Sequence, residues 1–358
     1  MANHVTLAVA GSRKTQSIVD HCASLARERR ALIVTYTQTN QAELRSRYAN
    51  HASDHPSVTV MGWFTFLLRE FARPFIPFRF RGERVLGFNF DGRPHRFAQG
   101  RARFLDSAGA AYACELARLA YELVEASGGA LVRRMECSYD EILIDEVQDL
   151  SGYDWNILDV LLRSAIEIRM VGDIRQSVLS TNARGSKNKK YAYSQAIEWF
   201  RERERSGELI ITENNTTWRC CPDVARFSDS IFDPAWSFPT TNSTNSKQTG
   251  HDGVFLVRPR HVLQYVERFR PQCLRDSANS GKLYALDYMN FRVAKGATYE
   301  RVLIIPTRGI DNFIKCGTPL DPIAASKLYV AVTRAAQSVA IAVDSPGISS
   351  LPYWEPSH

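Results

Sequence analysis

The chain has 358 residues with a formal net charge of +7, 44% hydrophobic and 23% charged residues, a composition typical of a globular protein large enough for two domains. No run of 18 apolar residues is present, so no membrane span is expected. Residues 1–9 lack the pattern of a signal peptide. Seven scattered cysteines without a CxxC pair argue against zinc or a disulfide framework. We therefore expect a cytoplasmic protein whose positive charge suits a polyanionic partner.

Short apolar runs alternate with helical segments, which predicts a mainly parallel sheet covered on both faces. In the first half, the predicted strands are His4–Val9, Ala31–Thr35, Val58–Met61, Glu141–Ile144, Glu167–Val171 and Leu209–Thr212, and the predicted helices are Gln16–Arg29, Gln41–Tyr48, Ala110–Ala126 and Tyr153–Ala165. In the second half, the predicted strands are Gly253–Val257, Arg301–Pro306 and Val339–Asp344, and the predicted helices are Val262–Arg268 and Ala324–Thr333. We place a domain boundary near Gly207, which gives domains 1–206 and 207–358, and we expect a solvated loop at Asp233–Gly253.

The first predicted strand runs into a candidate phosphate-binding loop. It comprises Ala10, Gly11, Ser12, Arg13, Lys14 and Thr15. A tight loop before a helix presents backbone N–H groups to phosphate, so Lys14 would reach the β- and γ-phosphates of ATP and Thr15 would ligate Mg²⁺. Ala8 and Arg13 occupy the glycine positions of the GxxxxGK[ST] pattern. An ordinary strand-to-helix turn is therefore the alternative for this segment taken alone.

A second element favours the nucleotide site. The apolar strand that ends at Ile144 is followed by two carboxylates, Asp145 and Glu146. Asp145 can hold Mg²⁺ through water, and Glu146 can take a proton from an attacking water. Because both halves of a nucleotide site occur in the usual order, a solvated turn is the weaker interpretation of these carboxylates.

Seven motifs in order resemble those of the UvrD/Rep family of superfamily 1 helicases. They are the segments Val34–Arg45, Gly62–Thr65, Asp145–Asp149, Val171–Ser177, Trp218–Cys220, Ala294–Tyr299 and Leu328–Ala335. The resemblance implies two RecA-like P-loop NTPase domains that bind ATP and Mg²⁺ between them.

The resemblance also implies roles for individual residues. Gln176 would sense the γ-phosphate, and Arg219 and Arg334 would supply cations from the second domain. Gln16, Lys295 and Gly296 would join the phosphate loop in nucleotide binding. The residues implied in contacts with single-stranded DNA are Thr35, Thr37, Asn40, Trp63 and Thr65. A core position is the alternative for Trp63, and a surface salt bridge is the alternative for each arginine.

Several positions depart from the family pattern. Arg13 replaces a glycine, Gln16 replaces an arginine that lies against the base, and Thr298 replaces a glutamate. A Cβ atom resists the positive φ that glycine adopts at the first of these positions, so Arg13 predicts a strained or shifted loop. The intervals that carry accessory domains in larger relatives are short here, so we expect accessory insertions to be reduced or absent, with a small insertion around 69–125.

Basic residues mark a candidate nucleic-acid surface. Residues Arg69–Arg103 contain nine arginines and three acids with interleaved phenylalanines, which suits phosphate contact and base stacking. The alternative is a half-buried hairpin at Phe88–Gly92 whose phenylalanines belong to the core. In the loop Arg184–Lys190, Arg184 and Lys187 are candidate phosphate contacts.

These features predict an Mg²⁺-dependent ATPase that translocates on, or remodels, single-stranded DNA or RNA. The alternative is an ATP- and DNA-responsive subunit that regulates a partner effector, like the compact UvrD-like proteins of Gabija-type phage defence. An inactive binding module is disfavoured because Lys14, Glu146 and Arg334 are all present.

Overall fold

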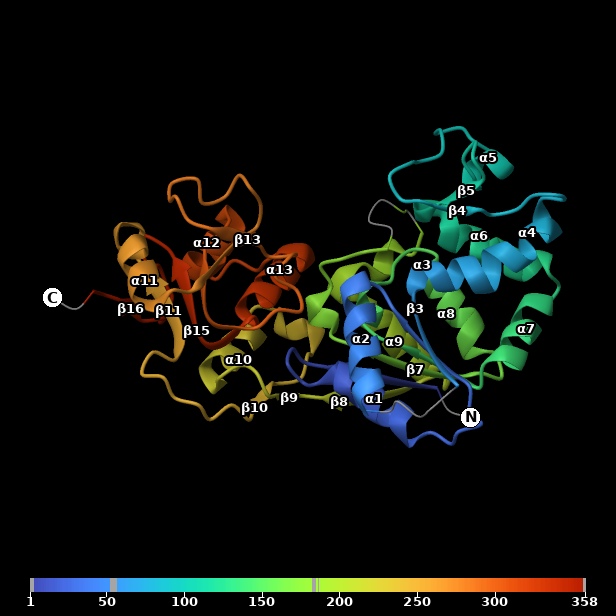
Figure 1. The fold of residues 1–358 in the computed structure, drawn as a ribbon. Coiled ribbons are helices and arrows are strands. Elements are labelled where there is room, and N and C mark those ends of the chain that lie inside the picture. The colour runs from blue at the N-terminus through green and yellow to red at the C-terminus, as the bar shows by residue number, and fades with distance from the viewer. Residues whose placement is uncertain (1–2, 52–56, 182–184, 186, 357–358) are drawn as a thin grey trace. The chain divides into compact units, whose positions relative to one another are not determined.

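The computed structural model describes residues 3–51, 57–181, 185 and 187–356. The chain folds into two compact units, each traced in Figure 1. Unit 1 comprises Met1–Leu7, Lys14–Gly172 and Ser180–Thr212, and unit 2 comprises Ala8–Arg13, Asp173–Leu179 and Glu213–His358. Two short segments of the first half of the sequence therefore pack with the second half.

Unit 1 is built on a six-stranded sheet in the order β3-β2-β6-β7-β1-β8. Its strands are β1 (His4–Ala8), β2 (Ala31–Thr35), β3 (Val58–Gly62), β6 (Glu141–Ile144), β7 (Glu167–Gly172) and β8 (Ile210–Asn214). The pairs β2–β3, β2–β6, β6–β7 and β1–β7 are parallel. The carboxyl ends of these strands therefore meet at one edge, where ligands bind in open α/β sheets.

Helices cover the centre of this sheet, where β2 and β6 are buried along their whole length. The helices of unit 1 are α1 (Lys14–Ser24), α2 (Gln38–His51), α3 (Trp63–Phe66), η1 (Leu67–Ala72), α4 (Arg73–Arg79), α5 (Arg101–Phe104), α6 (Ala113–Ala126), α7 (Ala130–Ser138), η2 (Val147–Asp149), α8 (Asp154–Leu162), η4 (Lys189–Tyr191), η5 (Tyr193–Gln195) and α9 (Ala196–Arg205). Val19 of α1 and Leu44 of α2 are fully buried against Ile33 of β2 and Leu143 of β6. One face of the sheet is thus closed by α1 and α2.

The insertion between β3 and β6 differs from the sequence prediction. A two-stranded sheet forms there from β4 (Gly87–Asn89) and β5 (Ala110–Tyr112), which pair in parallel. The predicted hairpin at Phe88–Gly92 is therefore wrong. The Asn89 side chain accepts a hydrogen bond from the Gly92 N–H at 2.6 Å, which turns the chain locally without returning it along β4. The predicted helix at Ala110–Ala126 begins later, at Ala113, because its first three residues form β5.

Unit 2 contains a second six-stranded sheet, in the order β13-β12-β14-β15-β11-β16, whose neighbouring strands all pair in parallel. Its strands are β11 (Gly253–Val257), β12 (Gln272–Arg275), β13 (Tyr288–Asn290), β14 (Tyr299–Ile304), β15 (Ala335–Ala342) and β16 (Tyr353–Trp354), and β9 (Thr216–Thr217) pairs separately with β10 (Asn242–Ser243). The helices of unit 2 are η3 (Ile174–Gln176), α10 (Pro222–Asp229), η6 (Pro234–Trp236), η7 (Pro259–His261), α11 (Val262–Phe269), α12 (Arg308–Cys316) and α13 (Pro322–Val332).

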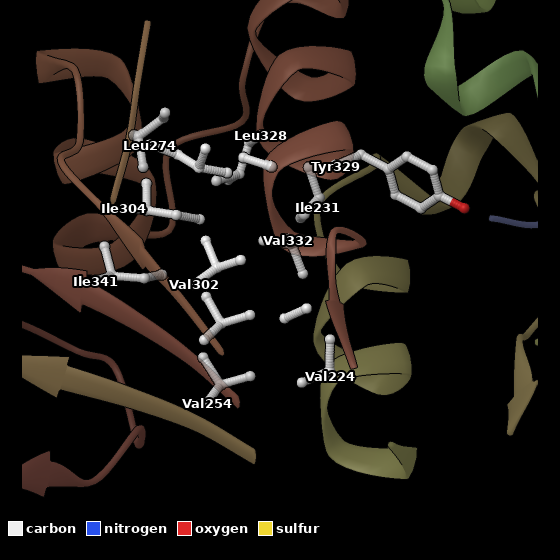
Figure 2. Packing of buried hydrophobic residues seen from close by; sticks show 14 of the residues in the cluster. Val224, Ile231, Val254, Leu274, Val302, Ile304, Leu328, Tyr329, Val332 and Ile341 are labelled. Carbon is white, nitrogen blue, oxygen red and sulfur yellow. The ribbon is translucent and has the colours of Figure 1, made fainter. Parts of the chain in front are cut away.

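Alternate residues of these strands lie in two hydrophobic cores, one on each face of the sheet. Val302 and Ile304 of β14 lie in a cluster with residues of α10 and α13, shown in Figure 2. Leu303, between them, lies in a second cluster with Tyr265 of α11. Helices therefore cover both faces of the sheet. The two parallel sheets confirm the predicted α/β class and are consistent with two RecA-like domains.

Candidate functional site

The candidate phosphate loop joins β1 to α1, and its tip is held by hydrogen bonds within unit 2. Thr217 Oγ1 donates to the Ala10 carbonyl at 2.7 Å, and the Trp218 N–H donates to the Gly11 carbonyl at 3.0 Å. Gly11 has φ of 76°, and a Cβ there would lie 2.6 Å from Cβ of Arg219. Glycine is therefore required at this close approach. The buried Ser12 hydroxyl has no hydrogen-bond partner in the described part of the chain.

Arg13 adopts φ of 63° and is exposed, so its backbone is strained, one of the two outcomes expected at this position. Such a conformation costs a residue with a Cβ roughly 1–3 kcal/mol. The Arg13 guanidinium lies 4.1 Å from the centroid of the Trp218 ring, and a cation–π contact at an exposed site contributes about 0.5–1 kcal/mol. The contact therefore offsets only part of the backbone strain.

Two pairs of candidate residues occupy one edge of the unit 1 sheet. Lys14 and Thr15, the last two residues of the phosphate loop, open α1, and Asp145 and Glu146 directly follow β6. Both strands belong to the same parallel sheet. The hydroxyl of Thr15 and the carboxylate of Asp145 are hard oxygen donors, which fit Mg²⁺ that keeps several waters. Among the described residues, no group of three or more His, Cys, Asp or Glu forms a metal site by itself.

The candidate base sits in an unusual backbone conformation. Glu146 has φ of 56°, in the left-handed region, and such strain clusters at functional sites. Its neighbours hold it: the Glu146 N–H donates to Asp145 Oδ1 at 3.0 Å, and the Gln148 amide donates to Glu146 Oε2. Asp145 is 2% exposed. The segment after β6 thus presents two fixed carboxylates.

A third group of candidate residues lies within unit 2. Gln176 Nε2 donates to Asp173 Oδ2 at 2.9 Å, and Arg334 Nη2 donates to Gln176 Oε1 at 3.2 Å. Arg334 is 1% exposed, and it also donates to the carbonyls of Val330 at 3.0 Å and Ala297 at 3.2 Å. Its guanidinium therefore ties the candidate γ-phosphate sensor to the turn that contains Lys295 and Gly296.

The remaining candidate nucleotide residues are placed individually. Arg219 Nη1 donates to the Thr333 carbonyl at 3.1 Å, directly before Arg334 in the chain. Lys295 is half-buried, and the exposed Gly296 has φ of 91°. Gln16 donates to Asp20 at 2.8 Å and accepts from Arg47 at 3.3 Å. The Gln16 amide is therefore engaged on the surface of α1 and α2.

Two of the predicted nucleic-acid contacts are buried. Trp63 is 1% exposed and its indole N–H donates to Asp154 Oδ1 at 2.7 Å, while Thr35 is also 1% exposed. Burial of both side chains contradicts their predicted direct contact with a nucleic-acid strand, and Trp63 belongs to the core. The sequence could not distinguish base stacking from a core position for Trp63, because an aromatic residue at the end of a strand is compatible with both directions of the ring.

The other predicted contacts remain accessible. Thr37, Asn40 and Thr65 are half-buried, and Thr37 Oγ1 accepts from the Asn40 N–H at 3.1 Å near the start of α2. Lys187 is exposed, with Nζ 5.8 Å from the centroid of the Tyr153 ring. Arg184 lies outside the described residues.

The phenylalanines of the insertion divide between core and surface. Phe71 and Phe104 are fully or nearly fully buried, whereas Phe78, Phe90 and Phe97 are exposed. The exposed rings lie among arginines, as shown by Arg96 stacked 5.5 Å from the Phe97 centroid. The core position therefore applies to Phe71 and Phe104 and not to the three exposed rings.

Sequence reasoning missed a buried junction at the start of α8. Asp154 accepts from Trp63, from the Ser151 N–H at 3.0 Å and from the Thr181 hydroxyl. Burial raises its pKa to about 6, against the effect of these hydrogen bonds. The Ser-x-x-Asp spacing of Ser151 and Asp154 is a helix-start signal that could have located it. A pocket of about 270 Å³ opens beside it, lined by Phe64, Arg118, Tyr153 and Lys187 among others.

Comparison with known proteins matches one part of the chain to a family model and finds solved structures that are similar to the chain. Residues 93–194 match the family model of the UvrD/REP helicase N-terminal domain. Two solved structures are similar over 95% of this chain: Arterivirus nonstructural protein 10 (helicase), at 15% identity with a TM-score of 0.46, and its complex with DNA, at 14% identity with a TM-score of 0.50. The chain spans 59% and 60% of those two chains.

The likeness to the DNA complex shows the fold alone. No curated protein matches the chain. In the described part of the chain, no helix has the length and apolar character needed to cross a membrane.

Proposed function

We propose that this protein is a superfamily 1 ATPase of the UvrD/Rep type that uses ATP and Mg²⁺ to translocate on, or remodel, single-stranded nucleic acid. One observation carries the proposal: Lys14 and Thr15 lie at the same edge of one parallel sheet as Asp145 and Glu146. The match of residues 93–194 to the helicase family model supports it independently.

The residues at this edge supply distinct steps of ATP hydrolysis. Lys14 and the N–H groups at the start of α1 bind the phosphates. Thr15 and Asp145 would hold Mg²⁺, which neutralises phosphate charge when it is bound. Glu146 accepts the proton of the attacking water.

Candidate residues of unit 2 would complete the proposed reaction. Gln176 orients toward the γ-phosphate, and Arg219 and Arg334 stabilise the charge that develops there. Lys295 and Gly296 join the nucleotide contacts. The domain boundary near residue 207 is part of the same proposal.

Nucleic acid is the proposed second ligand. The similar Arterivirus helicase has been solved in complex with DNA, and the arginine-rich insertion of this chain presents exposed Phe78, Phe90 and Phe97. Thr37, Asn40, Thr65, Arg184 and Lys187 are the proposed strand contacts. Arginines interleaved with exposed rings suit backbone contact and sequence-independent stacking.

A second candidate function is an ATP- and DNA-responsive subunit that regulates a partner protein. Arg13 favours it, because this residue of the phosphate loop has a strained backbone with positive φ and a side chain stacked on Trp218. A strained phosphate loop of this kind would suit a protein that handles ATP efficiently only after a partner reorders the loop.

Steady-state ATP hydrolysis with and without single-stranded DNA separates the candidates. We expect Mg²⁺-dependent turnover that single-stranded DNA stimulates and that EDTA abolishes. Turnover that requires a partner protein would favour the regulatory subunit. Absence of ATP binding and of turnover under all of these conditions would refute both.

A further inference from the structure

Tyr329 lies on α13 in unit 2 and is 1% exposed. Its ring packs against Phe232, with centroids 5.5 Å apart, and under the Arg175 guanidinium at 4.9 Å. Figure 2 shows the ring extending away from the aliphatic side chains of the sheet, with its hydroxyl at the far end. The packing of the ring therefore fixes the position of the buried hydroxyl, which lies beyond the aliphatic part of the core.

The Tyr329 hydroxyl makes two hydrogen bonds inside unit 2. It accepts from the Ala10 N–H at 3.2 Å and donates to Asp173 Oδ2 at 3.1 Å. A phenol has one proton to donate. The Tyr329 hydroxyl therefore donates it to the Asp173 carboxylate and accepts the Ala10 N–H through a lone pair on its oxygen. Two segments that are 163 residues apart in the chain, at Ala10 and Asp173, thus meet on one oxygen atom.

The same carboxylate oxygen orients Gln176. Asp173 Oδ2 accepts from Gln176 Nε2 at 2.9 Å, and Gln176 Oε1 accepts from Arg334 at 3.2 Å. With an acceptor on one side and a cationic donor on the other, the amide of Gln176 has a single satisfied orientation. The chain of contacts runs from the phosphate loop through Tyr329 and Asp173 to Gln176 and Arg334.

We propose that Tyr329 is a positioning residue for ATP hydrolysis: its hydroxyl fixes Asp173, and through it the Gln176 amide, relative to the backbone of the phosphate loop. The inference rests on the proposed ATPase function and adds a residue to it. Tyr329 touches neither nucleotide nor attacking water in this account. It acts on the chemical step by holding Asp173 and Gln176.

A phenylalanine at this position would keep the ring packing and remove only the hydroxyl. Asp173 would lose one donor, and the Ala10 N–H would lose its acceptor. The substitution leaves Lys14 and the start of α1, which we propose bind the phosphates, chemically unchanged. The substitution should therefore lower kcat and leave ATP affinity nearly unchanged.

Tyr265→Phe is the matched control. Tyr265 is also fully buried in unit 2, and its hydroxyl lies 2.9 Å from His251 Nε2 in the other core of the sheet. Loss of either hydroxyl removes one buried hydrogen-bonding group. Of these two tyrosines, Tyr329 is the one bonded to Asp173, which in turn accepts from Gln176. A general loss of packing or stability would affect both variants alike.

The experiment compares kcat, KM and ATP affinity of wild type, Tyr329→Phe and Tyr265→Phe in the full chain. We expect Tyr329→Phe to lower kcat roughly 10- to 100-fold, the effect of losing a hydrogen bond to a charged group, with ATP affinity within about threefold. Tyr265→Phe should keep kcat within about twofold. Equal kcat in Tyr329→Phe and wild type would overturn the inference, as would an equal loss in both variants.

A second variant keeps the test decisive if Tyr329→Phe does not fold. Asp173→Ala should show the same separation of kcat from ATP affinity, and a wild-type kcat in that variant would overturn the inference. If both fold, the double variant should be no slower than the slower single variant, because both act on Gln176. A wild-type chain that never hydrolyses ATP would instead refute the proposed function.

Discussion

The guanidinium of Arg13 lies 4.1 Å from the centroid of the Trp218 ring, and the Arg13 backbone has φ of 63°. The side chain therefore makes a stabilising contact, whereas the backbone is strained. Substitutions at this one position can separate the two effects, because alanine removes the contact and keeps the Cβ, whereas glycine removes both.

We predict that Arg13→Gly is more stable than Arg13→Ala. Relief of positive φ is worth roughly 1–3 kcal/mol, and the greater freedom of unfolded glycine returns about 0.5–1 kcal/mol of it. The expected difference in the free energy of unfolding is about 1 kcal/mol, measured by urea denaturation. We also expect Arg13→Gly to bind ATP about tenfold more tightly than wild type, a difference of about 1.4 kcal/mol. If the two variants are equally stable and bind ATP like wild type, the strain argument fails.

Binding to single-stranded DNA should weaken steeply with salt. Each phosphate contact on a single strand contributes about 0.7 to the slope of log K against log salt. Lys187 is exposed beside the pocket near Tyr153, so Lys187→Ala should reduce the slope by about 0.7. Lys315→Ala is the control, because Lys315 is paired with Asp311 at 2.8 Å. An unchanged slope in Lys187→Ala would remove this residue from the strand contacts.

Asp154 should make unit 1 more stable in mild acid. Burial raises its pKa from 3.8 to about 6, so the folded state retains a proton that the unfolded state has lost between these values. This contribution is fully present below pH 3.8 and disappears as pH rises through about 6. It is worth roughly 2–3 kcal/mol.

Asp154→Asn cannot titrate, so it isolates the effect. The free energy of unfolding of wild type minus that of Asp154→Asn should fall as pH rises from 4 to about 7, because only wild type must bury a charge. Urea denaturation across this range measures it. A difference that stays constant with pH would show that the buried carboxyl keeps an ordinary pKa.

His251 should have the opposite effect in unit 2. Its ring stacks on Phe255 at 4.2 Å and on Phe269 at 3.8 Å, and burial, together with the charge of Arg301, lowers its pKa from 6.5 to about 4. A neutral histidine in the fold contributes stability above pH 6.5 that is lost as pH falls toward about 4. His251→Gln should therefore lose less stability than wild type between pH 7 and about 4.5. Parallel loss in both proteins would contradict this.

Much of the fold could be predicted because its strands are buried and parallel. The bounds of β2, β6 and β11 agree with the predicted strands, since a strand covered on both faces is a continuous apolar run. The small strands β4 and β5 could not be predicted this way. Their pairing joins residues about twenty positions apart, and each strand is only three residues long.

Candidate site residues could be predicted where their position next to a strand or helix and their side-chain chemistry both point to a nucleotide site. Asp145 and Glu146 directly follow a strand that the apolar pattern locates, and Lys14 begins the helix after the loop that follows β1. The burial of Trp63 could not be predicted, because it depends on Asp154, which is 91 residues away. The contact between Tyr329 and Asp173 likewise joins residues 156 positions apart, and only tertiary structure reveals it.

The central claim is that Glu146 is the base for ATP hydrolysis at the edge of the unit 1 sheet. The measurement is ATP binding and single-turnover hydrolysis by wild type and Glu146→Gln, each with Mg²⁺ and single-stranded DNA. Glutamine keeps the shape of the side chain and cannot accept the proton of the water. We predict that Glu146→Gln binds ATP like wild type and hydrolyses it at least about 100-fold more slowly, as expected when a general base is lost. Hydrolysis by Glu146→Gln at the wild-type rate would contradict the account.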